Sequence, residues 1–126
     1  MKVLVAEDDP FIRDMAVAEL EDAGFEVVQA TTGGQALRLL QADFAIDALL
    51  TDIRMPEANG WEVARAYRER FPALPVLYVT GYAEQMQPVM GGVIISKPYT
   101  MTQIISLLDA MAVSVTLPER QQGHGS

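Results

Sequence analysis

The residues best suited to chemistry in this sequence follow its short apolar segments. They comprise three consecutive acids, a further acid, a hydroxyl and a cation: Glu7, Asp8, Asp9, Asp52, Thr80 and Lys97. Crowded carboxylates raise one another's pKa, so a fold that gathers them usually supplies a cation. Mg²⁺ suits an all-oxygen site and binds one or two carboxylates together with phosphate oxygens. The pattern therefore indicates a magnesium site that handles a phosphoryl group.

Three of these side chains have the types needed to transfer a phosphoryl group. Asp52 can act as a nucleophile and form an aspartyl phosphate. Lys97 and the metal would hold the equatorial oxygens, while the Thr80 hydroxyl would fill the remaining position. Each has a plainer alternative, as a turn or surface residue. Asp9 is interpreted as a helix N-cap, because Pro10 suits the first helical position, and it is left out of the metal site.

The elements that must position these residues alternate between apolar runs and helical periodicity. Strands are predicted at residues 2–6, 26–30, 47–51, 75–79 and 93–96. Helices are predicted at 10–23, 33–41, 60–70 and 101–115, with a weak one at 83–90. Capping boxes are predicted for Thr32 with Gln35, Asn59 with Glu62, and Thr100 with Gln103. Right-handed crossovers would cover both faces of a parallel sheet, and ligands bind at the carboxyl ends of such strands.

Composition favours one acidic α/β domain. The chain has 126 residues, 50% of them hydrophobic. Nine Lys and Arg against seventeen Asp and Glu give a net charge of −8, which disfavours direct contact with DNA and with anionic membranes. The absence of cysteine excludes disulfides and thiolate metal sites. Apolar stretches fall short of the roughly 20 residues of a membrane span, so we expect a cytoplasmic protein.

Four segments, in order, resemble the signature of response regulator receiver domains. They read VLVAEDDP at 3–10, LLTDIRMP at 49–56, VTG at 79–81 and SKPY at 96–99. The resemblance covers residues 2 to about 115, so we assign 1–116 to a receiver domain and expect 117–126 to be a disordered tail. It implies the flavodoxin-like receiver fold, an α/β fold whose five-stranded parallel sheet has the order 2-1-3-4-5.

The resemblance also implies a role for each site residue. Asp52 would be the phosphoacceptor and a metal ligand, with Thr80 and Lys97 on the phosphoryl oxygens. The remaining metal ligands would be Asp8, Glu7 through water, and the backbone carbonyl of Arg54. The family often has a cis bond at its Lys-Pro, which makes Lys97–Pro98 a candidate for that geometry.

The implied function is that of a two-component phosphorelay receiver. A sensor histidine kinase or a histidine phosphotransfer protein would supply the phosphoryl group in a Mg²⁺-dependent reaction, and the signal would pass to an unknown protein by contact. Such a chain is a switch and not an enzyme, apart from slow self-phosphorylation and self-dephosphorylation. Since Met1 lies just ahead of the first strand, a stand-alone regulator or shuttle is favoured over a receiver cut from a larger protein.

One position departs from the family pattern. Many receivers carry an aromatic residue three positions before the lysine, and this sequence has Ile94 there. The usual coupling of that aromatic to the threonine is therefore in doubt, and Tyr82 or Tyr99 could report the signal instead. We expect phosphorylation to shift the loop after the fourth strand together with the weak helix behind it.

Three other functions remain as alternatives. A Mg²⁺-dependent phosphohydrolase would need a second acid two residues after Asp52, where Arg54 stands. A flavin- or nucleotide-binding module would need a phosphate cradle after the first strand, where Glu7 begins an acidic run. An interaction module that is never phosphorylated would have no need to keep the acids and Lys97 together.

Overall fold

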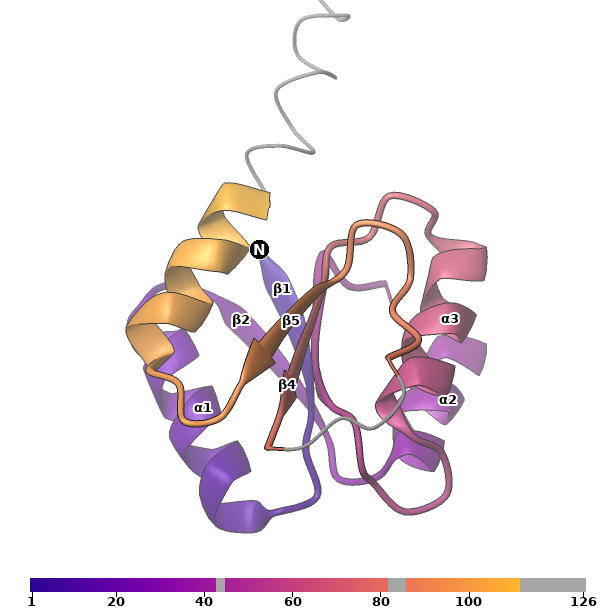
Figure 1. Ribbon diagram of the computed structural model, residues 1–126, viewed down its shortest axis with the longest axis horizontal. Helices are drawn as coiled ribbons and strands as arrows, with labels where there is room; N and C mark the ends of the chain where they lie inside the picture. Colours follow the sequence, from indigo (N-terminus) through magenta and orange to yellow (C-terminus); the bar gives the residue numbers. More distant parts are fainter. Residues whose placement is uncertain (43–44, 82–85, 112–126) are drawn as a thin grey trace, which may run out of the picture.

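Five parallel strands form one sheet with helices on both faces (Figure 1). The computed structural model describes residues 1–42, 45–81 and 86–111. The strands are β1 Lys2–Ala6, β2 Glu26–Ala30, β3 Ala48–Asp52, β4 Val76–Thr80 and β5 Val93–Ser96. The helices are α1 Pro10–Asp22, α2 Gly33–Gln41 and α3 Gly60–Arg70, and residues 101–111 are also helical. The sheet order is β2-β1-β3-β4-β5, which confirms the predicted fold.

The sheet separates two apolar clusters. Along β1, Val3 and Val5 face one cluster while Leu4 and Ala6 face the other, as the period of two along a strand requires. The first cluster joins β1 to α1 and to the helix at 101–111, and the second joins the sheet to α2 and α3. Figure 1 shows the same division, with α1 and the final helix on the left and α2 and α3 on the right. Within the described residues, every helix is too short or too polar to span a bilayer.

Local capping sets where the helices begin. The Asp9 side chain accepts from the backbone N–H of Phe11 and of Ile12, with Pro10 following it, which confirms its N-cap role. The predicted capping boxes at Asn59 with Glu62 and at Thr100 with Gln103 are present. At α2 only half of the box forms. Thr32 accepts from Gln35 N–H, but the Gln35 side chain accepts from Thr31 N–H instead of from Thr32.

Two strands are displaced by one residue from their predicted positions. The strands predicted at 47–51 and 75–79 begin and end one residue later. Asp52 is therefore the last residue of β3, paired with Val79, and Thr80 is the last residue of β4, paired with Ser96. Both remain at the carboxyl ends of their strands. Helix α1 stops one residue earlier than predicted.

The helix predicted at 83–90 is wrong over its described part. Residues 86–89 have no regular structure and 90–91 form a turn, while 83–85 lie outside the described residues. Pro88 cannot donate a helical hydrogen bond and disfavours helical backbone in the residue before it. Gly91 has a φ of 76°, outside the helical region. Residues 112–115 of the final predicted helix, and the predicted tail, also lie outside the described residues.

Candidate functional site

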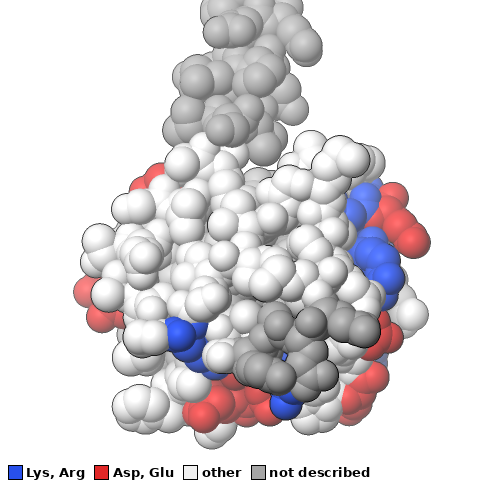
Figure 2. All heavy atoms as spheres, in the orientation of Figure 1, with Lys and Arg blue, Asp and Glu red and all other residues white. Residues whose placement is uncertain are grey.

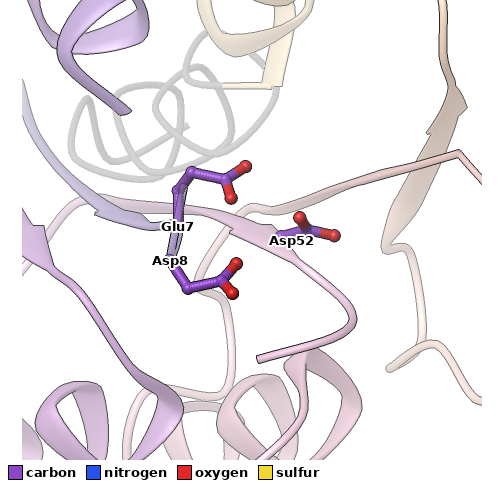
Figure 3. Close-up of side chains that lie close together, drawn as sticks. All are labelled: Glu7, Asp8 and Asp52. Carbon is purple, nitrogen blue, oxygen red and sulfur yellow. The ribbon is translucent and has the colours of Figure 1, made fainter. Parts of the chain in front are cut away.

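Three acidic side chains meet at the carboxyl ends of β1 and β3. The two strands pair in parallel, with Ala6 opposite Thr51, so Glu7 and Asp8 emerge beside Asp52. Figure 3 shows the three carboxylates gathered at these neighbouring strand ends, and one oxygen from each lies within 4.8 Å of the other two. Strand pairing therefore brings together residues that are far apart in the sequence.

Glu7 is held in place by its backbone and is buried, with 4% of its surface exposed. Its N–H donates to the Ala30 carbonyl on β2 at 3.1 Å, and its carbonyl accepts from Arg13 Nη1 at 2.9 Å. Its Oε2 accepts from the Asp9 N–H at 3.1 Å. Burial raises the pKa of Glu7 from 4.5 to about 7, and the Asp52 charge adds to the increase. The carboxylate is therefore costly to ionise without a nearby cation.

Thr80 at the end of β4 and Lys97 after the end of β5 complete this group. Lys97 Nζ lies 3.7 Å from Asp52 Oδ2, while Asp52 Oδ1 accepts from the Ile53 N–H at 2.6 Å. The Lys97 N–H donates to the Thr80 carbonyl at 2.8 Å. Thr80 is 5% exposed. The bond between Lys97 and Pro98 is cis, one of the geometries considered from the sequence.

The loop after β3 is fitted tightly to Asp52. The Gly60 N–H donates to the Ile53 carbonyl at 2.8 Å, and a Cβ at position 60 would overlap the Asp52 carbonyl oxygen. Only glycine allows α3 to begin this close to the strand end. Arg54 lies in this loop, two residues after Asp52, with an exposed side chain.

The same loop is also joined to α2. Glu57 has a φ of 77°, the left-handed region that side chains other than glycine rarely adopt. Its Oε1 accepts from Thr32 Oγ1 at 3.1 Å and lies 3.5 Å from Arg38 Nη1. A Cβ at Gly34 would overlap that carboxylate. The start of α2 therefore supports the segment that follows Asp52.

The acids, Lys97 and Thr80 thus lie together as the sequence predicted. Tyr99 is half-buried, and its burial raises its pKa, to which the charges of Glu7 and Asp52 add. Tyr82 lies outside the described residues. Sequence reasoning missed Arg13, which holds the Glu7 carbonyl. It also interpreted Asn59 only as a helix cap, although the glycine that follows it is a usable signal for a close approach of the backbone.

The donor atoms fit a hard divalent cation. Carboxylate oxygens are the ligands that Mg²⁺ prefers in proteins, and the site offers three carboxylates. Burial, and after it the charge of Asp52, raises the pKa of Glu7, and a bound cation would offset both effects.

Comparison with known proteins identifies the family. A family model described as the response regulator receiver domain matches residues 3–109. The chain belongs to this family. A probable transcriptional regulatory protein of Picosynechococcus is 34% identical over 96% of this chain. The chain spans only 50% of the length of that protein. The response regulator receiver protein CpdR of Brucella abortus is 32% identical over 90% of this chain and 98% of its own length.

Solved receiver structures have the same fold. A receiver protein from Sinorhizobium medicae is 33% identical, with a TM-score of 0.85 covering 89% of this chain and 94% of that one. The response regulator TrrA of Thermotoga maritima, solved in complex with Mg²⁺ and BeF, is 24% identical, with a TM-score of 0.77 covering 87% and 97%. At that identity the second likeness concerns the fold alone.

Proposed function

We propose that this receiver accepts a phosphoryl group on Asp52 from a phosphohistidine donor and signals by a change of conformation. The observation that carries the proposal is the position of Asp52, between the acids Glu7 and Asp8 and the Lys97 ammonium at 3.7 Å. A carboxylate flanked by a cation site and an ammonium group can approach an anionic phosphoryl group. Without those partners, repulsion would prevent the approach.

Mg²⁺ is the proposed cofactor. Asp8, Asp52 and the Arg54 carbonyl would hold it directly, and Glu7 through water. The bound ion would neutralise the phosphoryl oxygens and orient them for in-line transfer. That TrrA was solved with Mg²⁺ and BeF supports this choice by analogy of fold.

In the proposed transfer, an Asp52 carboxylate oxygen attacks phosphorus. A phosphorus–oxygen bond forms while the phosphorus–nitrogen bond of the donor breaks, and the electron pair stays on the imidazole nitrogen. Lys97 would hold one oxygen of the transferred group, and the Thr80 hydroxyl would donate a hydrogen bond to another. Water would later release the phosphate slowly.

The donor would be a histidine kinase or a histidine phosphotransfer protein, and the output would be a protein contact. A net charge of −8 argues against direct binding to DNA. The relative from Picosynechococcus is about twice as long as this chain, so any activity of its remaining half is not carried over.

Intact-mass measurement after incubation with Mg²⁺ and acetyl phosphate tests the proposal. We expect one phosphoryl adduct that is lost in EDTA and in Asp52→Asn. Asp47→Asn is the matched control. It removes an acid at the other end of β3, where Asp47 accepts from the Lys2 N–H at 2.7 Å. An adduct of equal yield in Asp52→Asn would refute the proposal, and steady release of phosphate from unrelated esters would favour the phosphohydrolase.

A further inference from the structure

The chain between β4 and β5 is held at its described end by two side chains. The Tyr78 hydroxyl oxygen accepts a hydrogen bond from the Val89 N–H at 3.1 Å. Arg68 Nη1 donates to the Met90 carbonyl at 2.6 Å. These two contacts, which we call the Tyr78–Arg68 clamp, bind the backbone of residues 89–90 in place of the helical hydrogen bonds that are missing there.

The Tyr78 ring is fixed and cannot act as a rotating switch. It is fully buried, and its centroid lies 4.6 Å from that of the Trp61 ring. A Cβ at Gly92 would lie 2.9 Å from Tyr78 Cε2. In a close-packed interior such a ring has no space to swing outward. Tyr78 pairs with Ile94, the position where many receivers carry an aromatic, so here the hydroxyl of a neighbouring strand is the group that can make or break a contact.

Both elements that carry the clamp also reach the Asp52 site. Tyr78 lies two residues before Thr80 on β4, so their side chains share one face of the sheet. Arg68 belongs to α3, whose first residue, Gly60, packs on the Asp52 carbonyl. A displacement at the site would therefore be carried to residues 89–90 by a strand and by a helix.

Two methionines of the segment at residues 86–92 are exposed to solvent. Met86 is 63% exposed and Met90 is 91% exposed. Figure 1 shows the chain leading to β5, in orange, beside α3, and Figure 2 shows the middle of the same view as largely uncharged. Methionine side chains are flexible, so their positions can follow a movement of this backbone.

We propose that the Tyr78–Arg68 clamp stabilises the resting state of the switch and that phosphorylation of Asp52 opens it, releasing the backbone of residues 89–90. This inference rests on the proposed phosphorylation of Asp52 and adds the contacts that respond to it. A contact made only in the resting state opposes the signalling state. By linkage, removing that contact tightens the binding of any ligand that favours the signalling state.

Tyr78→Phe tests the clamp, because it removes the hydroxyl and keeps the ring. Calorimetry would measure the affinity for beryllofluoride, a phosphoryl mimic, in the presence of Mg²⁺. We expect Tyr78→Phe to bind about fivefold more tightly, since one net hydrogen bond of the resting state is lost. Amide hydrogen exchange should show Val89 losing protection when beryllofluoride binds the wild-type protein, and unprotected from the start in Tyr78→Phe.

Tyr67→Phe is the matched control. Tyr67 is equally buried and lies on α3, but its hydroxyl donates to the Ala36 carbonyl at 2.7 Å, away from the clamp. This variant should lose stability without a change in beryllofluoride affinity. Arg68→Lys is a second clamp variant, because one ammonium cannot reproduce the fork that also bonds the Leu74 carbonyl at 2.6 Å. It should tighten binding as Tyr78→Phe does.

The outcomes separate the two proposals. Unchanged or weaker affinity in both clamp variants would overturn the clamp, as would retained Val89 protection in the beryllofluoride complex. The same proteins are examined for the Asp52 adduct by intact mass. A wild-type protein that forms no adduct refutes the proposed function, whereas a normal adduct with unchanged affinities refutes the clamp alone.

Discussion

The acidic site lies at the carboxyl ends of the strands, whereas residues 86–92 lead into the amino end of β5, and the two regions are built differently. Parallel pairing positions the site, with Ala6 opposite Thr51 and Thr80 opposite Ser96. The segment contains a turn but no helix or strand, and its backbone is bonded by two side chains and by the Gly92 N–H, which donates to the Val89 carbonyl at 2.9 Å. We infer that strand pairing positions the site, whereas the contacts of the segment can change without unpairing a strand.

Lys97→Met should have the largest effect of these variants. It should slow phosphorylation and leave the stability of the fold nearly unchanged. We expect phosphorylation of Asp52 by acetyl phosphate to slow about 100-fold, because a preorganised positive group beside the transferred phosphoryl contributes roughly that much. Stability should change little, since an ion pair at 3.7 Å with a partly exposed lysine is weak. Rates would be followed by intact mass. Met90→Gln in the segment is the control and should leave the rate unchanged, and equal rates for both variants would contradict the comparison.

Gly60→Ala should disturb the site through packing. The added Cβ would overlap the Asp52 carbonyl, so we expect a loss of about 2 kcal/mol in the free energy of unfolding, the usual cost of overpacking. Urea denaturation measures it. At Gly81 an added Cβ would lie 3.7 Å from Lys97 Cδ, an ordinary contact. Similar losses for Gly60→Ala and Gly81→Ala would show that the fit to Asp52 is not tight.

Stability should depend on pH through Glu7. Its pKa is raised from 4.5 to about 7 in the folded protein, so between these values the folded state binds more protons than the unfolded state. Stability is therefore lost as pH rises through this window. In EDTA we expect the melting temperature to fall on the order of 5 °C across it. Mg²⁺ should reverse this fall in melting temperature, and Glu7→Gln should abolish it. If the melting temperature of Glu7→Gln fell as steeply with pH as that of the wild type, another group would be the cause.

Asp9→Ala should have the smallest effect. Loss of the N-cap of α1 should lower the free energy of unfolding by about 1 kcal/mol. The phosphorylation rate should stay the same, because Asp9 accepts from Phe11 and Ile12 and lies outside the proposed metal site. Thermal denaturation measures the loss of stability, and the intact-mass assay of the adduct measures the phosphorylation rate. Asp9→Asn keeps the cap and should match the wild type, and slow phosphorylation in both variants would place Asp9 in the site.

The site was predictable because its geometry follows from where strands end. Apolar runs locate β1 and β3, and parallel pairing then brings their carboxyl ends to one edge. A shift of one residue in the bounds of β3 did not matter, since Asp52 stays at the strand end either way. Helix starts were predictable for a similar reason, because a cap such as Asp9 acts only on its nearest neighbours.

The segment was not predictable because its contacts are not local. The spacing of the apolar residues around Met86 is typical of a helix, but Pro88 and the positive φ of Gly91 oppose one. The backbone is then held by Arg68, 22 residues from Met90 in the sequence. The spacing of residues in the sequence does not indicate which side chain will donate a hydrogen bond to a distant carbonyl. The role of Arg13 at the Glu7 carbonyl escaped prediction for the same reason.

The contact between Glu57 and Gly34 links two positions 23 residues apart. Gly34 leaves the space that the Glu57 carboxylate fills, and Glu57 adopts a backbone conformation better suited to glycine. A glycine at 57 would remove both the strain and the overlap, and alanine would then be allowed at 34. Among related sequences these two positions should covary, with a side chain at one accompanied by glycine at the other.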